Sequence, residues 1–438
     1  MNDGLKKRWI ILISVVGFVA AFIVLFSVFF SSDTIEVGVF TGSNWDVANA
    51  NSFVVMDRAV EKFTRSHPDV KVHYYSGIRK DEYSEWFSRL LLRGNEPDVF
   101  MVLDEDFNLL AEEGVLENLE SFMEEDKLFD VEKYYSTALD AGKYMGTQYA
   151  LPYETVPMLM FVNKTLLNKS GIMVPDNNWT WEDFYRISKL VTKDADGDGV
   201  IDQFGSYNYS WTEAAYSNNV TLFDEKGNNG YFTGEKLEEA LKFTELLNSL
   251  NQGEKVTKDD FDGGNVAFMP LPFTEYRTYK TYPYRIKKYT DFQWDCITMP
   301  AGPSGGNISA VNSLVMGISS HSNNKKLAWE FLKLMTYDEE MQMDIFRYSQ
   351  GASVLHEVTS STMVKKILQE DIEVNEKFID NAVIDSVLKN GVAIPGFPKY
   401  EGAMNLADSE INRMLEEEDG LDNSLRLLQR QINKYLEK

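Results

Sequence analysis

The sequence predicts an α/β protein in which strands and helices alternate along the chain. With 438 residues it exceeds one compact core, and about 150 residues per domain gives two or three units. Hydrophobic residues make up 44% and aromatic residues 13%, which is typical of a folded chain. Apolar segments with a two-residue period alternate with segments of helical period, and this favours a mostly parallel sheet covered by helices.

The N-terminal end predicts a membrane anchor. Residues 9–30 form an uncharged, almost wholly apolar run that follows Lys6, Lys7 and Arg8. A helix of this length crosses the hydrocarbon core, and the preceding positive charge keeps residues 1–8 in the cytoplasm. We therefore expect a single-pass protein of the cell membrane with its bulk outside.

A cleaved signal peptide is the alternative to a retained anchor. The apolar part of such a peptide usually spans about 7 to 15 residues and ends in small residues. Here the run ends VFFSSD, without an A-x-A pattern. The only cysteine is Cys296, so a lipid-carrying cysteine after the run and a disulfide within one chain are both excluded.

The charge balance bears on partners. Asp and Glu number 68 against 43 Lys and Arg, which gives a formal net charge of −25. This field repels a phosphate backbone, so we expect no nucleic-acid partner. Neutral ligands fit it better than anions.

Residues 34–103, which follow the apolar run, predict strand, helix, strand, helix, strand. The pieces are TIEVGVF, a helix with Phe53, Met56, Val60 and Phe63 on one face, VKVHYY, EYSEWFSRLLLRG and PDVFMVL. In such a sheet, ligands bind at the carboxyl ends of the strands. This places Asn44, Trp45 and Asp104 at the rim of a candidate site.

The rest of the chain continues the alternation. We expect short strands at 149–152 and 158–162, helices at 181–190 and 234–250, and a strand in GGNVAFMPLPF. Two strands around a Gly/Pro/Ser loop and the helix KKLAWEFLKLMT follow. Beyond Gly351 the chain is helical, and a C-terminal stripe predicts core packing through Leu421, Leu425, Leu428, Ile432 and Leu436.

The segment DADGDGVID, residues 194–202, matches most of a calcium loop. Oxygen ligands at alternate positions wrap a cation, and Gly199 stands where a sharp turn is required. Gly205 replaces the bidentate Glu of the full pattern, so a further ligand must come from elsewhere or from water. An Asp/Gly turn that binds nothing is the alternative. The expected ligands of a structural Ca²⁺ are Asp194, Asp196, Asp198, Val200 and Asp202.

Several motifs, in order, resemble one family. PDVFMV, YALPYE, FVNKTLL, TWEDF, the acidic turn, GGNVAF and ITMPAGPSGG, spread over residues 34–355, resemble bacterial extracellular solute-binding proteins of family 1, the carbohydrate-binding components of ABC importers. The resemblance implies a two-lobe fold of the type II periplasmic-binding-protein kind. It places residues 34–148 and 292–348 in the first lobe and 149–291 and 349–438 in the second, with crossings near 145–152, 288–295 and 348–354.

The resemblance also implies a function. A monomer would capture a carbohydrate, in this family an oligosaccharide, between its lobes and deliver it unreacted to the permease of an ABC importer. Sugars need aromatic faces together with carboxylates and amides. Besides Asn44, Trp45 and Asp104, the expected ligand-binding residues are Tyr153, Glu154, Trp211, Phe273, Glu275, Asn312 and Gln350. Trp211 and Phe273 match family positions that supply stacking platforms, whereas any one aromatic taken alone favours core packing.

Two other functions stay open at this point. A retained anchor also suits an external sensor or scaffold for a membrane partner. A carbohydrate-active enzyme is the other alternative, but GPSGG around Ser304 lacks the strand and helix of a nucleophile elbow, and the four histidines show no zinc spacing. We therefore expect a binding protein with no catalytic residues.

Overall fold

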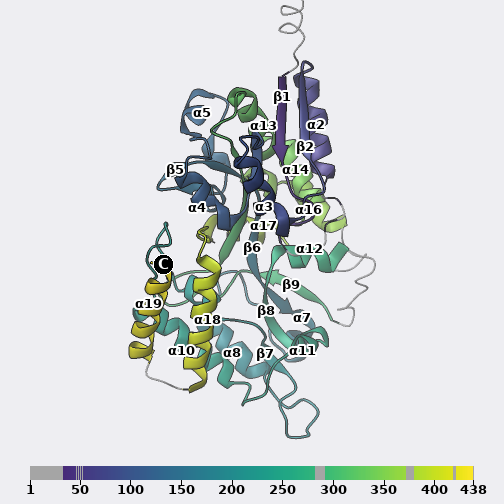
Figure 1. Cartoon of the computed structure of the whole chain (residues 1–438). Coiled ribbons are helices and arrows are strands. Elements are labelled where there is room, and N and C mark those ends of the chain that lie inside the picture. Colours follow the sequence, from purple (N-terminus) through teal and green to yellow (C-terminus); the bar gives the residue numbers. More distant parts are fainter. Residues whose placement is uncertain are drawn as a thin grey trace, which may run out of the picture.

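The computed structural model describes residues 33–45, 47, 49, 51, 53–281, 292–370, 379–417 and 421–437. Two α/β lobes share one sheet of order β2-β1-β3-β10-β6-β8-β7, with β11 beside β10 and β9 beside β6 (Figure 1). The predicted anchor at residues 9–30 lies outside the described part of the chain. Within that part, no helix combines the length and the apolar character needed to cross a bilayer.

The first lobe is built around the N-terminal strands. β1 runs parallel to β2 and β3, and β10 runs antiparallel to β3. An apolar face at helical spacing buries α2 through Val55, Met56, Ala59 and Phe63. Met56 and Phe63 of the predicted face are buried, whereas Phe53 and Val60 are half-buried at its edge. The elements are β1 (Asp33–Gly38), α2 (Val54–Ser66), β2 (Val70–Tyr75), α3 (Lys80–Leu91), β3 (Val99–Val102), α4 (Asp104–Glu112), α5 (Glu120–Glu125), α6 (Ser136–Asp140), β4 (Lys143–Tyr144), β5 (Thr147–Gln148), β10 (Ala310–Ile318), α13 (Lys325–Tyr337) and α14 (Glu339–Tyr348).

One long strand, β6 (Ala150–Asn163), belongs to both lobes. Its first half pairs with β10, and its second half pairs with β8 and β9. The expectation of two short strands here is wrong. Pro152 does not break the strand because it lies at a β-bulge, where the register with β10 shifts between Leu314 and Val315 and the proline needs no ladder hydrogen bond.

The second lobe contains the remaining strands and most of the later helices. The TWED segment starts α8 with a capping box, in which Thr180 and Asp183 satisfy each other's backbone N–H groups. α18 and α19 pack together along one flank (Figure 1). The elements are α7 (Lys164–Lys169), α8 (Trp181–Val191), β7 (Phe204–Ser206), α9 (Trp211–Ser217), α10 (Glu235–Ser249), α11 (Lys258–Asp262), β8 (Val266–Pro272), β9 (Trp294–Ile297), α18 (Tyr400–Glu417) and α19 (Leu421–Leu436).

The sheet is mixed, which corrects the expectation of a mostly parallel one. β1–β2, β1–β3, β7–β8 and β10–β11 are parallel, whereas every pairing of β6 is antiparallel. The alternation of residues 34–103 predicts only the local parallel unit β2-β1-β3. β10, from a later part of the chain, lies beside β3 in the opposite direction, and β6 is in turn antiparallel to β10.

Each lobe has its own main apolar core. One apolar cluster lies entirely in the second lobe and its C-terminal helices, and it includes the α19 stripe at Leu425, Leu428, Ile432 and Leu436, as predicted. A larger cluster lies beneath the first-lobe sheet and continues past β6 to Phe261. The lobes are therefore separate on their outer sides and continuous through the shared strand.

Three helices after residue 355 pack beside the first lobe. α17 (Asn381–Asn390) meets α6, where the Tyr135 hydroxyl donates to Asp385 at 2.7 Å, and it also contacts α15 (His356–Thr359). α16 (Thr362–Glu370) contacts α14. The lobe boundaries stay a prediction, and these contacts differ from the assignment of all residues 349–438 to the second lobe. Two further elements, α12 (Phe273–Thr281) and β11 (Val392–Ala393), lie near the crossings between the lobes.

Candidate ligand-binding cleft

A cavity of about 620 Å³ lies between the lobes. On the first-lobe side it is lined by residues that follow β1 and β3 and by the first residue of α3: Asn44, Trp45, Lys80, Asp104 and Glu105. These are the carboxyl ends of parallel strands and the N-termini of the next helices, where the rule for such sheets places ligands. The expectation that Asn44, Trp45 and Asp104 share one rim is confirmed in their positions.

The opposite wall comes from β6, the end of β8 and a segment near the C-terminus. Met158, Pro272 and Thr274 contribute to it, and Asn312 of β10 reaches the cavity at its base. The remaining lining residues are Val156, Ile394, Pro395, Gly396, Phe397, Pro398, Tyr400 and Glu401. Both lobes therefore present groups to the same space.

The segment from Ile394 to Tyr400 links β11 to α18 and supplies the aromatic face of the second lobe. The ring of Phe397 lies 5.6 Å from that of Tyr400 in an edge contact, and the Tyr400 hydroxyl is 3.4 Å from that of Tyr216. A Cβ at Gly396 would lie 2.9 Å from the carbonyl oxygen of Asp104, so glycine allows this segment to pass close to the first lobe.

Sequence reasoning missed this segment. It was covered only by the general expectation that residues beyond Gly351 are helical. The signal was present in IPGFPKY, because two prolines and a glycine beside aromatic residues predict a loop between helices.

Acidic side chains outnumber basic ones in the lining of the cavity. Lys80 donates through Nζ to the carbonyl oxygen of Asn44 at 2.6 Å. Asp104 is exposed to the cavity, and desolvation by the surrounding protein raises the cost of its charged form. This desolvation, together with neighbouring Glu105, raises the pKa of Asp104 to about 7, against a lowering contribution from Lys80.

Four of the predicted ligand-binding residues are buried elsewhere. Glu154 is 5% exposed and accepts hydrogen bonds from the Ser349 hydroxyl and the Gly351 backbone N–H. Burial raises the pKa of the Glu154 carboxyl, and these hydrogen bonds oppose that shift. Tyr153, its neighbour on β6, is also buried. These two residues lie at a crossing between the lobes and do not line the cavity.

Trp211 and Phe273 are core residues, which corrects the expectation that they are stacking platforms. Trp211 is 1% exposed, and Phe273 is fully buried with its ring stacked on Tyr276 at 5.8 Å. Helical spacing on α9 and the turn into α12 point both rings inward. Glu275 and Gln350 are half-buried and lie outside the lining of the cavity.

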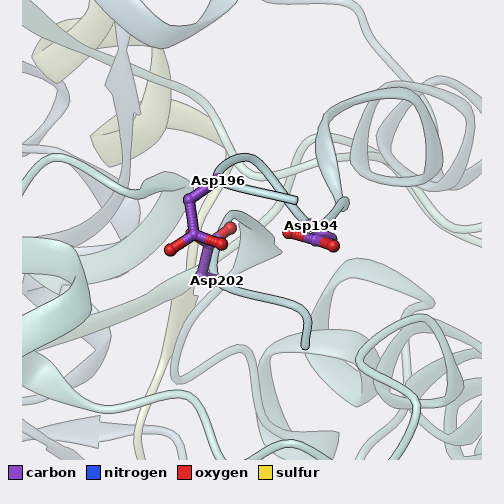
Figure 2. Close-up of side chains that lie close together, drawn as sticks. All are labelled: Asp194, Asp196 and Asp202. Carbon is purple, nitrogen blue, oxygen red and sulfur yellow. The ribbon is translucent and has the colours of Figure 1, made fainter. Parts of the chain in front are cut away.

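The acidic turn brings three carboxylates together, as Figure 2 shows. Oxygen atoms of Asp194, Asp196 and Asp202 lie within 4.8 Å of one another. Asp194 accepts from the N–H groups of Gly199 at 2.7 Å and Gly197 at 2.6 Å, and these bonds lower the pKa of its carboxyl. These backbone N–H groups therefore favour the ionised form of the Asp194 carboxyl.

The other two expected calcium ligands are placed differently. Asp198 accepts from the N–H of Val200 at 2.8 Å and is not part of the three-carboxylate group. The side chain of Val200 is 46% exposed and makes no core contact, while its carbonyl lies in the same turn. Three carboxylate ligands are therefore gathered, and the role of calcium stays a prediction.

Ser304 lies in the loop between β9 and β10, with its hydroxyl donating to Glu239 at 3.2 Å. This is a loop position, as the prolines and glycines of GPSGG predict. A nucleophile elbow would require a strand before the serine and a helix directly after it.

Similarity to solved structures covers nearly the whole chain. UspC from M. tuberculosis matches 92% of this chain and 100% of its own with a TM-score of 0.74 at 17% identity. The sugar-binding protein MalE from Xanthomonas citri matches 92% and 97% with a TM-score of 0.73, also at 17% identity. An ABC substrate-binding protein from Listeria monocytogenes in complex with cycloalternan matches 93% and 100% with a TM-score of 0.64 at 21% identity. These confirm the two-lobe α/β fold.

The relatives found by sequence match a smaller part of the chain than the solved structures do. A maltotriose-binding protein from Pyrococcus abyssi is 21% identical over 341 residues, which are 73% of this chain and 68% of that protein. A binding protein from Brucella abortus is 24% identical over 237 residues, and the match spans about half of each chain, 51% of this one and 54% of the relative.

A family model described as bacterial extracellular solute-binding protein matches residues 49–342. The match begins after β1, Asn44 and Trp45, and it includes α3, β3 and α4 of the first-lobe wall, the acidic turn and the shared strand β6. On this evidence, the chain belongs to the bacterial extracellular solute-binding protein family.

Proposed function

We propose that this protein binds an oligosaccharide in the cavity between its lobes and delivers it, chemically unchanged, to an ABC importer. The observation that carries the proposal is the two-sided lining of that cavity. The first lobe contributes an indole, carboxylates and an amide, and the second contributes a phenol ring and a carboxylate. Aromatic faces for C–H surfaces beside acceptors for hydroxyls are the combination that sugars need.

The size and charge of the site agree with this ligand class. About 620 Å³ is within the range of small-molecule sites and accommodates more than one sugar ring. Asp104, Glu105 and Glu401 exceed the single lysine in number, so an anionic ligand is disfavoured. The names of the relatives agree as well, since they include a maltotriose-binding protein and a sugar-binding protein.

Delivery would follow from lobe closure. A ligand that touches both lobes binds the closed arrangement more tightly and shifts the population toward it. The closed form is then the one that a permease recognises. We place the protein, as a monomer, outside the cell and tethered by residues 9–30.

The acidic turn is proposed as a structural calcium site. Asp194, Asp196 and Asp202 would hold the ion, with the Val200 carbonyl and water completing its shell. The loop lies on the second lobe after α8, and the lining of the cavity does not include it. The ion would stabilise the lobe and take no part in ligand binding.

A sensor or scaffold is the second candidate function, and the long apolar run before residue 31 favours it. Deletion of the chromosomal copy separates the two. Loss of sugar uptake supports the importer component. Unchanged uptake, together with co-purification of a histidine kinase, supports the sensor.

A thermal-shift screen against a panel of neutral oligosaccharides tests the binding proposal, because a ligand that binds only the native state raises the melting temperature. We expect at least one maltooligosaccharide or related glycan to raise it in a concentration-dependent manner and to be recovered unshortened. A panel without any shift, with the protein folded, would sink the proposal.

A further inference from the structure

We propose that Glu225 is the centre of a latch between the lobes that sets the affinity of the cleft without touching the ligand. This deepens the proposed function and rests on it, because the latch acts on the same closure that ligand binding would drive. Glu225 was not among the expected site residues. It lies outside the lining of the main cavity.

The contacts run from the second lobe to the first. Glu225 is in the loop 224–229 between α9 and α10. Its carbonyl oxygen accepts from Nδ2 of Asn108 on α4 at 3.3 Å, and its carboxylate Oε1 accepts from the N–H of Gly146 at 3.2 Å. Asn108 is 8% exposed, so its amide is held in place by the packing around α4.

The Gly146 donor is presented by a tight turn. Met145 and Gly146 join β4 to β5 with φ of 53° and 78°, and positive φ at both central residues is the requirement of a type I′ hairpin turn. In such a turn the N–H of the second central residue takes no part in the turn's own hydrogen bond. It therefore points outward and is available to a carboxylate.

The loop that carries Glu225 is stiffened by its own side chains. Asp224 accepts from the N–H of Asn228 and from Nδ2 of Asn229, both at 2.7 Å, and its N–H donates to the Asn229 carbonyl at 3.0 Å. Glu225 follows directly. Its position is thus fixed before it meets the first lobe, which lowers the entropic cost of the contact.

Phe397 connects the latch to the ligand cavity. Phe397 is among the residues that line that cavity but is only 2% exposed, and a Cβ added at Gly227 of the latch loop would lie 2.3 Å from its ring. The ring also meets Phe223, at the base of the loop, at 5.3 Å. A ligand that packs against the segment 394–400 therefore acts on the latch loop through the buried ring of Phe397.

A second cavity, of about 370 Å³, lies between the latch and the segment that walls the ligand cavity. It is lined by Asn108, Gly146 and Glu225 of the latch and by Ile394, Pro395 and Gly396 of the segment that also walls the main cavity. Separation of the lobes would open this space and break both latch hydrogen bonds. The latch therefore exists only in the joined arrangement.

The consequence for affinity follows from population arithmetic. When only the joined arrangement binds fully, the apparent dissociation constant equals the intrinsic one divided by the joined fraction. Loss of the carboxylate contact lowers the ratio of joined to separated molecules by about fivefold, the effect of one ordinary hydrogen bond. Apparent affinity for every ligand weakens by up to the same factor.

The test measures lobe separation without ligand. Leu92 at the end of α3 and Met173 in the second lobe are 88% and 87% exposed, and Leu92→Cys with Met173→Cys accepts one spin label per lobe in a Cys296→Ala background. Pulsed electron paramagnetic resonance then gives the distance distribution in the parent, Glu225→Ala, Glu225→Gln and Asn108→Ala proteins. Glu254→Ala is the matched control, because it removes the same charge from an exposed site on the second lobe.

We expect Glu225→Ala and Asn108→Ala to move population toward the longer distance, and Glu225→Gln to restore the parental distribution because its amide oxygen still accepts from Gly146. Distributions that are the same in Glu225→Ala and the parent, with both folded by their melting temperatures, overturn the latch. An equal shift in Glu254→Ala also overturns it, since that would be a charge effect. The readout needs no ligand, so a negative carbohydrate panel sinks the proposed function and leaves this test intact.

Discussion

The indole Nε1 of Trp211 donates a hydrogen bond to Oδ1 of Asp408 at 2.7 Å, and this bond joins α9 to α18 inside the second lobe. Trp211 is the first residue of α9 and lies between Ser210 and Glu213, which form a capping box that fixes the start of the helix. The ring also lies 6.3 Å from Phe232. The sequence suggests Trp211 as a stacking platform for sugar, but in the structure this residue connects α9 to α18.

Replacement of Trp211 tests this role. We expect Trp211→Ala to lower the free energy of unfolding by about 3–5 kcal/mol, because it leaves a cavity in the core. Trp211→Phe keeps most of the packing and loses only the hydrogen bond. We therefore expect a smaller loss of unfolding free energy and the same ligand affinity as in the parent protein. Urea denaturation and calorimetric titration measure the two quantities. A large affinity loss in a stable Trp211→Phe protein would instead return Trp211 to the binding site.

The aromatic residues of the cavity should behave in the opposite way. Trp45 and Tyr400 face the cavity from different lobes, and each is only partly buried without ligand. We expect Trp45→Ala and Tyr400→Ala to weaken binding of a glycan found in the panel by about 1.5–3 kcal/mol each, from lost burial of aromatic surface. Isothermal titration checks this, with Tyr231→Ala as an exposed aromatic control on the second lobe. Parental affinity in both cavity variants would contradict the assignment of the cleft.

Asp104 predicts a pH dependence with a defined sign. Its pKa is about 7 in the folded chain against 3.8 for an ordinary aspartate, so the folded protein holds this proton more tightly than the unfolded one. Its contribution to stability is therefore fully present below about pH 4 and is lost as pH rises toward 7 and above. Denaturation at several pH values should show a slope that is flatter in Asp104→Asn and unchanged in the exposed-site control Asp69→Asn. Equal slopes in all three proteins would refute the shift.

Calcium should stabilise the fold through the acidic turn. A ligand at a hundred times its dissociation constant adds about 2.7 kcal/mol to the stability of the native state. We expect added Ca²⁺ to raise the melting temperature, a chelator to reverse the rise, and Asp196→Asn to abolish it while keeping the acceptor for the Asp198 N–H. No response to calcium in the parent protein would leave the turn as an Asp/Gly loop held by its own hydrogen bonds.

The membrane tether is checked by fractionation. Full-length protein expressed in a bacterial host should sediment with membranes and resist extraction by high salt, since a helix of about 20 apolar residues inserts stably. A version without residues 1–30 should stay soluble. N-terminal sequencing of the mature protein separates the alternatives, because a start beyond residue 30 would identify a cleaved signal peptide.

Local patterns predicted most elements of the fold. VKVHYY is β2 in full, KKLAWEFLKLMT lies within α13, and the helix expected at 234–250 is α10, Glu235–Ser249. Periodicity succeeds there because each segment buries one face. It gave the wrong count at β6, where Pro152 and Pro157 look like breaks but are accommodated by the bulge and by pairing with β10.

The site was predictable only on one side. Asn44, Trp45 and Asp104 follow directly from strands β1 and β3, so a rule about strand ends finds them. The opposite wall depends on Phe397 and Tyr400, which reach the cleft because β11 adds to β10 and carries the next residues across it. Such a long-range pairing leaves no periodic pattern in the sequence. The burial of Trp211 and Phe273 in the core leaves none either, so the sequence does not reveal that these rings lie away from the cleft.

The uninterrupted course of β6 also limits how the protein can move. Fourteen residues from Ala150 to Asn163 carry pairing partners of one lobe at one end and of the other lobe at the other end. Any swing of the lobes must bend or twist this strand, because hydrogen bonds tie one end of it to each lobe. The β-bulge opposite Leu314 and Val315 interrupts the regular ladder, so the strand can bend there while the pairing on either side is kept.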